Sequence, residues 1–173
     1  HLIQISTDQV YDGLGPHGES DIKVVNTYGL TKYAGELAAL QVASTVLRTN
    51  FVGKSDVEGR ESLTDWLVNA LKNEQHVQVL SDVKFSPVSM ETLCTVIEQV
   101  VVVKPIGVFN VGSSNGMTKA DFNFAFAEAL GLPTKFMSLI ESSDAKFLRA
   151  RRPKDMTMDS SKIETNLGIS IPS

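Results

Sequence analysis

The stretch LIQISTD (residues 2–8), followed after a polar loop by TYGLTKYAGELAALQV (residues 27–42), decides the fold of this chain. The first segment is a β-rich apolar run that ends in hydroxyl and carboxyl side chains, which is typical of a buried strand. The second segment carries apolar residues near helical spacing. Strands continue to alternate with helices along the chain, which is the pattern of a parallel sheet covered on both faces.

The remaining elements are expected from local periodicity and from capping signals. We expect strands at residues 45–48, 77–80, 108–111 and 135–140, and helices at residues 61–73, 89–103, 119–130 and 160–166. Ser89 is the expected cap of one helix, and Thr118 with Asp121 resembles a capping box at the start of another. Gly131-Leu132-Pro133 is a signal for the end of that helix.

Composition excludes several classes of function. The chain has 173 residues, 42% of them hydrophobic, and a formal net charge of −4 with no basic patch, so we expect no nucleic-acid partner. No apolar run approaches the roughly 18 residues of a membrane span, so we expect no membrane partner. The first residues lack the features of a signal peptide, and we expect a cytoplasmic protein. Cys94 is the single cysteine and is expected to be buried on a helix. The three histidines have no ligand spacing, so no metal site is expected.

Two glycine motifs match known patterns in letters only. Residues 13–18, GLGPHG, fit the dinucleotide-binding pattern, but Pro16 removes an amide and no helix follows directly. Residues 112–116, GSSNG, fit the nucleophile-elbow pattern of hydrolases and do lie between a strand and a helix. All three histidines precede Ser114, however, which is the wrong order for that triad. A serine hydrolase is therefore only a third hypothesis.

A third motif, Tyr28-x-x-x-Lys32, begins the helix of residues 27–42. Spacing of four residues puts both side chains on one helix face. A phenol normally titrates near about pH 10, and an ammonium held close to a phenol stabilises the phenolate. Thr7 ends the preceding strand, at the sheet edge where open α/β sheets hold ligands. A hydroxyl, a phenol and a cation could thus converge on one carbonyl group.

These residues resemble a known family when they are taken together. The matching segments are ISTDQVYDG (5–13), ESD (19–21), NTYGLTKYAGE (26–36), VLRTNFV (46–52), VFNVG (108–112) and residues 152–164. They resemble extended short-chain dehydrogenases/reductases and are most similar to the dTDP-4-dehydrorhamnose reductases. The resemblance runs nearly end to end, and the combination is far more specific than any single motif.

The resemblance implies a fold and a division of the chain. The fold would be a partial Rossmann-type parallel sheet with a small C-terminal substrate-binding lobe. Residues 1–53 would belong to the Rossmann-type domain, and residues 54–173 mostly to the lobe, with residues 77–112 returning to the sheet. The family also has about a hundred preceding residues that carry the glycine-rich nucleotide loop. We therefore expect this chain alone to be inactive and to bind the dinucleotide poorly.

The resemblance also implies roles for individual residues. Tyr28 would protonate the carbonyl oxygen, Lys32 would stabilise the phenolate and bind the nicotinamide ribose, and Thr7 would hydrogen-bond the same oxygen. The substrate would contact Asp8, Phe51 and Arg152, with Arg152 on the phosphates. The residues expected to bind the cofactor, NADPH or NADH, are Ser6, Tyr28, Lys32, Thr49, Asn50 and Phe51. Because the family often has Trp where Phe51 stands, the identity of the sugar stays open.

The implied activity is NAD(P)H-dependent reduction of a nucleotide-linked 4-keto-6-deoxy sugar. A related 4,6-dehydratase is disfavoured because it needs a carboxylate at position 9, and Gln9 cannot abstract a proton. A 4-epimerase would use the same residues. A different class also remains, since the same fold serves as the non-catalytic regulatory subunit of methionine adenosyltransferase. The nucleotide sugar is the expected partner, and the family resemblance allows a homodimer.

Overall fold

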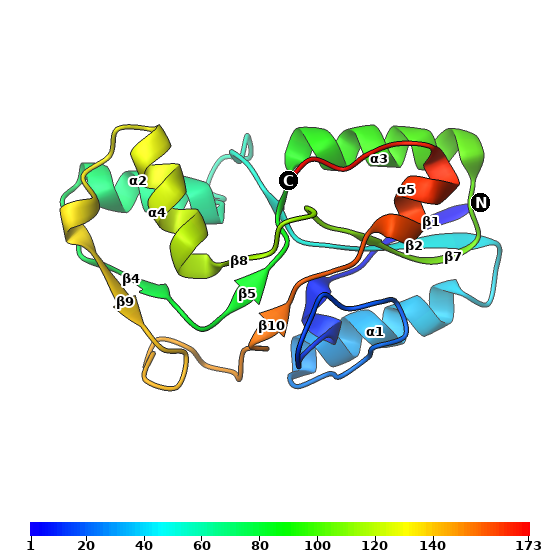
Figure 1. The fold of residues 1–173 in the computed structure, drawn as a ribbon, viewed down its shortest axis with the longest axis horizontal. Coiled ribbons are helices and arrows are strands. Elements are labelled where there is room, and N and C mark those ends of the chain that lie inside the picture. The colour runs from blue at the N-terminus through cyan, green and yellow to red at the C-terminus, as the bar shows by residue number, and fades with distance from the viewer.

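Three parallel strands form the sheet of the first lobe in the computed structural model, which describes residues 1–173 (Figure 1). The strands lie in the order β1 (Leu2–Ile5), β2 (Ser44–Thr49) and β7 (Gly107–Val111). Ile5 pairs with Leu47, and Leu47 pairs with Phe109, so the carboxyl ends of all three strands lie at one edge. Every residue of the central strand β2 is buried, as expected for a strand covered on both faces.

Helices cover both faces of this sheet. α1 (Thr27–Ala39) lies on one face, and α3 (Met90–Val103) lies on the other together with α5 (Ser161–Leu167), as Figure 1 shows. The core between the sheet and the α3 side contains Leu47, Val88, Leu93, Val96, Val100, Phe109, Val111, Ile163 and Ile171. The expected α/β class and Rossmann-type parallel sheet are therefore confirmed.

A second lobe has its own core. It consists of α2 (Leu63–Lys72), β4 (Val77–Leu80), α4 (Lys119–Ala129), the short 3-10 helix η2 (Thr134–Phe136) and β9 (Met137–Ile140). Its buried apolar residues are Leu67, Ala70, Leu71, Val77, Val79, Ala120, Ala127 and Met137. None of the helices combines the length and the apolar character that a membrane span requires.

Short strands join the two lobes. β10 (Asp155–Met156), β5 (Lys84–Phe85) and β8 (Met117–Thr118) form one small sheet, and β3 (Phe51–Val52) pairs with β6 (Val88–Ser89). The 3-10 helix η1 (Asp8–Val10) follows β1 directly. This arrangement brings the carboxyl end of β1, the start of α1 and the start of α4 toward the junction of the lobes.

The capping signals behave as the sequence predicts. The Ser89 hydroxyl accepts from the Thr92 amide, and Thr118 with Asp121 forms the predicted capping box. A second capping box, Ser62 with Asp65, begins α2 and was not predicted.

Two expectations about position are wrong. β4 pairs with β9 in the second lobe and does not return to the first sheet. Its alternating burial explains this, because only Val77 and Val79 face the core of that lobe. Cys94 is exposed, since the buried face of α3 is the one that carries Leu93 and Val96.

Candidate functional site

The Tyr28-x-x-x-Lys32 motif occupies the first two turns of α1. Asn26 caps the helix by accepting a hydrogen bond from the Gly29 amide at 2.8 Å. Gly29 lies so close to η1 that an added Cβ would be 2.5 Å from the Gln9 carbonyl oxygen. The Lys32 ammonium donates to the carbonyl oxygen of Ile5 at 2.7 Å, which ties it to the last residue of β1. The Tyr28 side chain is 52% exposed and free of protein hydrogen bonds at its hydroxyl.

Thr7, Asp8 and Asn50 come together at the carboxyl ends of β1 and β2. The Thr7 hydroxyl accepts from the Gln9 amide and donates to Asp8 Oδ1, each at 3.2 Å. The Asn50 amide donates to Asp8 Oδ2 at 2.6 Å. Asp8 is 1% exposed, and burial raises the pKa of its carboxyl despite these hydrogen bonds and the nearby positive charge of Lys119.

Ser6 belongs to a different network. Its hydroxyl donates to Glu36 on α1, and Glu36 pairs with the buried Arg48 of β2. Arg48 also donates to the Tyr11 hydroxyl at 2.8 Å. Burial raises the pKa of Tyr11 to about 12, so this phenol stays protonated. The network uses the Ser6 hydroxyl in a buried bond to Glu36, whereas the Thr7 hydroxyl makes only the local contacts to Asp8 and Gln9.

Two cavities border Gln9 of η1, and the first of them also borders the start of α1. The first, about 640 Å³, is lined by Tyr28, Asn26 and the arginine-rich segment of residues 147–152. The second, about 250 Å³, is lined by Asn50, Trp66 and Lys119 among others. The two cavities share the wall residues Gln9, Phe147, Leu148 and Arg152. Tyr28 and Arg152 therefore line the first cavity together, and Arg152 also lines the second.

Gln9 and Asn26 hold the arginine-rich segment beside the start of α1. The Asn26 amide donates to Gln9 Oε1 at 3.2 Å and to the Arg151 carbonyl oxygen at 3.1 Å. Gln9 Oε1 also lies 3.5 Å from the Arg152 guanidinium. These contacts of Gln9 and Asn26 were not predicted from the sequence, although the cluster of Arg149, Arg151 and Arg152 is visible in it.

Thr49 and Phe51 line neither of these two cavities. Thr49 is buried at the end of β2, and its hydroxyl has no hydrogen-bond partner. Phe51 is 45% exposed in β3. Ser114 is exposed, and no hydrogen bond joins it to a histidine, so the hydrolase hypothesis gains no support. His17, which follows Pro16, instead hydrogen-bonds the Asp155 carbonyl oxygen at 3.0 Å.

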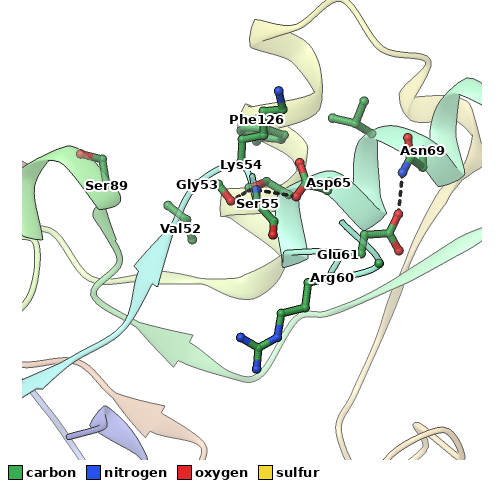
Figure 2. Close-up of a pocket in the computed structure, with 13 residues that line it drawn as sticks. Val52, Gly53, Lys54, Ser55, Arg60, Glu61, Asp65, Asn69, Ser89 and Phe126 are labelled. Atoms are coloured by element: carbon green, nitrogen blue, oxygen red, sulfur yellow. Dashed lines mark hydrogen bonds between the residues drawn. The ribbon is translucent and has the colours of Figure 1, made fainter. Parts of the chain in front are cut away.

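A larger cavity, about 980 Å³, lies elsewhere, between the segment of residues 52–61, α2 and Phe126 (Figure 2). None of the site residues predicted from the sequence lines it. Its carboxylates are already bonded within the protein: Asp65 accepts from the Ser55 amide at 2.8 Å, and Glu61 accepts from Asn69 (Figure 2). The hydrogen bond from Ser55 lowers the pKa of Asp65. We therefore place the candidate site at the two smaller cavities.

Comparison with known proteins identifies the family. A family model described as the RmlD substrate binding domain matches residues 1–173. The chain belongs to this family. Methionine adenosyltransferase 2 subunit beta of Pongo abelii is 32% identical over 97% of this chain and 52% of its own length.

Solved structures agree with the assignment to the RmlD family. A hypothetical dTDP-4-dehydrorhamnose reductase from Sulfolobus tokodaii is 26% identical, with a TM-score of 0.84 over 100% of this chain and 60% of its own. A dTDP-4-dehydrorhamnose reductase from Bacillus anthracis, solved in complex with NADP, shares the fold with a TM-score of 0.87, at 22% identity and 99% and 61% coverage. The chain therefore spans only about half to three fifths of the length of these relatives.

Proposed function

We propose that this RmlD-family chain is the substrate-binding part of a reductase that acts on a nucleotide-linked 4-keto-6-deoxy sugar. The proposal rests on the cavity that Tyr28 and Arg152 line together. A half-exposed phenol and a guanidinium line one cavity, and the guanidinium also lines the next. A sugar carbonyl near Tyr28 and a phosphate near Arg152 would match this order of groups.

The chemistry assigned to the protein is proton donation and orientation. A nicotinamide cofactor, when bound, would supply hydride to the carbonyl carbon. The Tyr28 hydroxyl gives its proton to the carbonyl oxygen, which stays bonded to the sugar carbon and becomes the hydroxyl group of the product. Thr7 can turn its hydroxyl from Asp8 to the same oxygen, because the Asn50 amide still holds the Asp8 carboxylate. Lys32 has two N–H donors beyond the bond to Ile5, and these suit the phenolate and a ribose hydroxyl.

The residues at the sheet edge fit a nicotinamide cofactor, NADPH or NADH. Thr49 keeps a buried hydroxyl without a partner at the carboxyl end of β2, and a polar ligand group would satisfy it. Asn50 and Phe51 follow Thr49 and would approach the same end of the cofactor. Ser6 is left out of this set because its hydroxyl bonds Glu36. A single cysteine and the soluble substrate accord with a cytoplasmic location.

A 4-epimerase would use the same phenol, lysine and hydroxyl. A dehydratase would need a base at position 9, and Gln9 there is a neutral amide that bridges Asn26 and Arg152. A second class of function has its own support, since the chain is 32% identical to a subunit of methionine adenosyltransferase. In that role the chain would bind a partner enzyme, and Tyr28 would have no reaction to catalyse.

The test is turnover of a dTDP-linked 4-keto-6-deoxy sugar by the full-length protein that carries this chain. We expect consumption of NADPH or NADH that depends on the keto sugar, with a 4-hydroxy sugar nucleotide as product. Conversion of a 4-hydroxy sugar nucleotide into its 4-epimer, with no net consumption of cofactor, would support the epimerase. No turnover, together with a changed rate of a methionine adenosyltransferase catalytic subunit on mixing, would support the partner-subunit role.

A further inference from the structure

Lys119, the first residue of α4, carries an ammonium without a polar partner. Its Nζ lies over the Phe85 ring, 3.4 Å from the ring centroid. No carboxylate forms a salt bridge with it, and no acceptor forms a hydrogen bond with its Nζ. Lys119 is half-buried, and a partly desolvated cation costs free energy unless an anion completes its surroundings.

The carboxylate of Asp8 acts on Lys119, but it forms no salt bridge with Lys119 and does not line the cavity of about 250 Å³. Burial lowers the pKa of Lys119 to about 8, Asp8 on η1 raises it, and Arg152 lowers it further. Asp8 is already bonded by Asn50 and Thr7. Arg152 lines the same small cavity as Lys119, so two cations share its wall. The cavity therefore has an excess of positive charge and suits a ligand with two negative charges.

Asn123, one turn further along α4, adds a second group without a partner. Its amide nitrogen donates to the Lys119 carbonyl oxygen at 2.7 Å, which fixes the orientation of the side chain. Its Oδ1 is buried, has no hydrogen-bond partner, and belongs to a residue that is only 4% exposed and lines the same cavity. Trp66 lines this cavity as well and offers an aromatic surface.

We propose that Lys119 is a specificity-determining residue that binds the diphosphate of the substrate from the small cavity, opposite the sugar end at Tyr28. Asn123 then accepts a hydrogen bond from an N–H or O–H of the nucleoside, beside Trp66. Arg152 lies between the two ends, since it lines both cavities. This inference rests on the proposed function for the nature of the ligand, and it adds residues of α4 that the Tyr28-x-x-x-Lys32 motif does not include.

The test is binding of dTDP to the full-length protein, measured by isothermal titration calorimetry. The substitution Lys119→Met should weaken binding about tenfold or more, since a hydrogen bond to a charged group contributes about 1.5–3 kcal/mol. The matched control is Lys135→Met, because Lys135 also lies over a phenylalanine ring in the same lobe, 4.8 Å from the Phe136 centroid, but is exposed. That control should bind dTDP as the unmodified protein does.

Proton uptake provides a readout that a structural role for Lys119 would not give. A bound diphosphate favours the ammonium form, so above about pH 8 the unmodified protein should take up protons when it binds dTDP. Titrations in buffers of different ionisation enthalpy measure this uptake. Lys119→Arg keeps the charge and should keep most of the affinity but lose the uptake, which covers the case in which Lys119→Met does not fold.

The outcomes separate this inference from the proposed function. Binding of dTDP that depends on Lys119, without reduction of any keto sugar, would support the nucleotide site and overturn the reductase. Equal affinity and equal proton uptake in the unmodified protein and in Lys119→Met would overturn the role of Lys119, even if reduction is observed. Absence of dTDP binding by the unmodified protein would overturn both.

Discussion

The guanidinium of Arg48 lies 2.6 Å from the carboxylate of Glu36, and both side chains are at most 2% exposed. This ion pair joins α1 to β2, the central strand of the first sheet, and Ser6, Tyr11 and the carbonyl oxygen of Glu19 complete its hydrogen bonds. Because α1 carries Tyr28 and Lys32, the pair also fixes the helix that presents the proposed proton donor.

Removing one partner of this pair should destabilise the fold strongly. Arg48→Met leaves the Glu36 carboxylate buried without a cation, and such changes cost about 3–5 kcal/mol. Urea denaturation measures the free energy of unfolding. Lys54→Met is the control, because the Lys54–Asp56 pair is exposed at 82% and 92% and should change stability by less than about 1 kcal/mol. Equal losses of unfolding free energy in both variants would show that the buried pair contributes no more to stability than the exposed pair.

Tyr28→Phe should abolish most of the catalysis without loss of stability. The variant removes only the proton donor, and general acid catalysis contributes about a hundredfold to ten-thousandfold to rate. The side chain is half exposed, so the melting temperature should stay unchanged. Steady-state turnover of the keto sugar measures the effect, with Tyr33→Phe on the same helix as the control. Full activity in Tyr28→Phe would remove this residue from the mechanism.

Arg152→Gln should weaken binding of the nucleotide diphosphate about tenfold, because a guanidinium contact to phosphate is lost. Arg60→Gln is the control, since Arg60 lines only the large cavity of Figure 2. Affinities for dTDP from titration calorimetry compare the two variants. A larger loss in the Arg60 variant would move the substrate site to the large cavity.

The burial of Asp8 should appear in the pH dependence of stability. Its folded-state pKa is raised, so the folded protein binds this proton more tightly than the unfolded chain does. The contribution of Asp8 is therefore most favourable below its unfolded pKa of about 3.9 and is lost as pH rises through the higher folded value. Asp8→Asn should remove that decline. Urea denaturation between acid and neutral pH tests this, and parallel curves for both proteins would contradict it.

Much of the fold could be predicted because its signals are local. The helices that begin at Ser89 and Thr118 follow from caps and periodicity within a few residues. Pairing of β4 with β9 could not be predicted in this way, because it depends on residues about 60 positions apart in the chain. Leu30 and Leu37 support the helix prediction yet are 57% and 49% exposed, since Glu36 faces the sheet to meet Arg48.

The candidate site likewise has one part that the sequence predicts and one part that it does not. Tyr28 and Lys32 are four residues apart on one helix, so their spacing alone predicts a shared face. Lys119 and Asn123 are also four residues apart, but nothing in the sequence near them indicates that they line a cavity or that Lys119 lies close to Asp8 and Phe85. Their environment arises only when η1, β5 and α4 meet, so it needed the structure.

The most direct test of the central claim is transfer of deuterium from a nicotinamide cofactor deuterated at the reactive carbon to a dTDP-linked 4-keto-6-deoxy sugar. The full-length protein would be incubated with both compounds, and the product would be analysed by mass spectrometry. Our account predicts deuterium at the sugar carbon that bore the carbonyl, and about a hundredfold less of it, or lower still, when Tyr28→Phe replaces the unmodified protein over the same time. An unlabelled, unreduced sugar with the unmodified protein, under conditions in which dTDP binds, would contradict it.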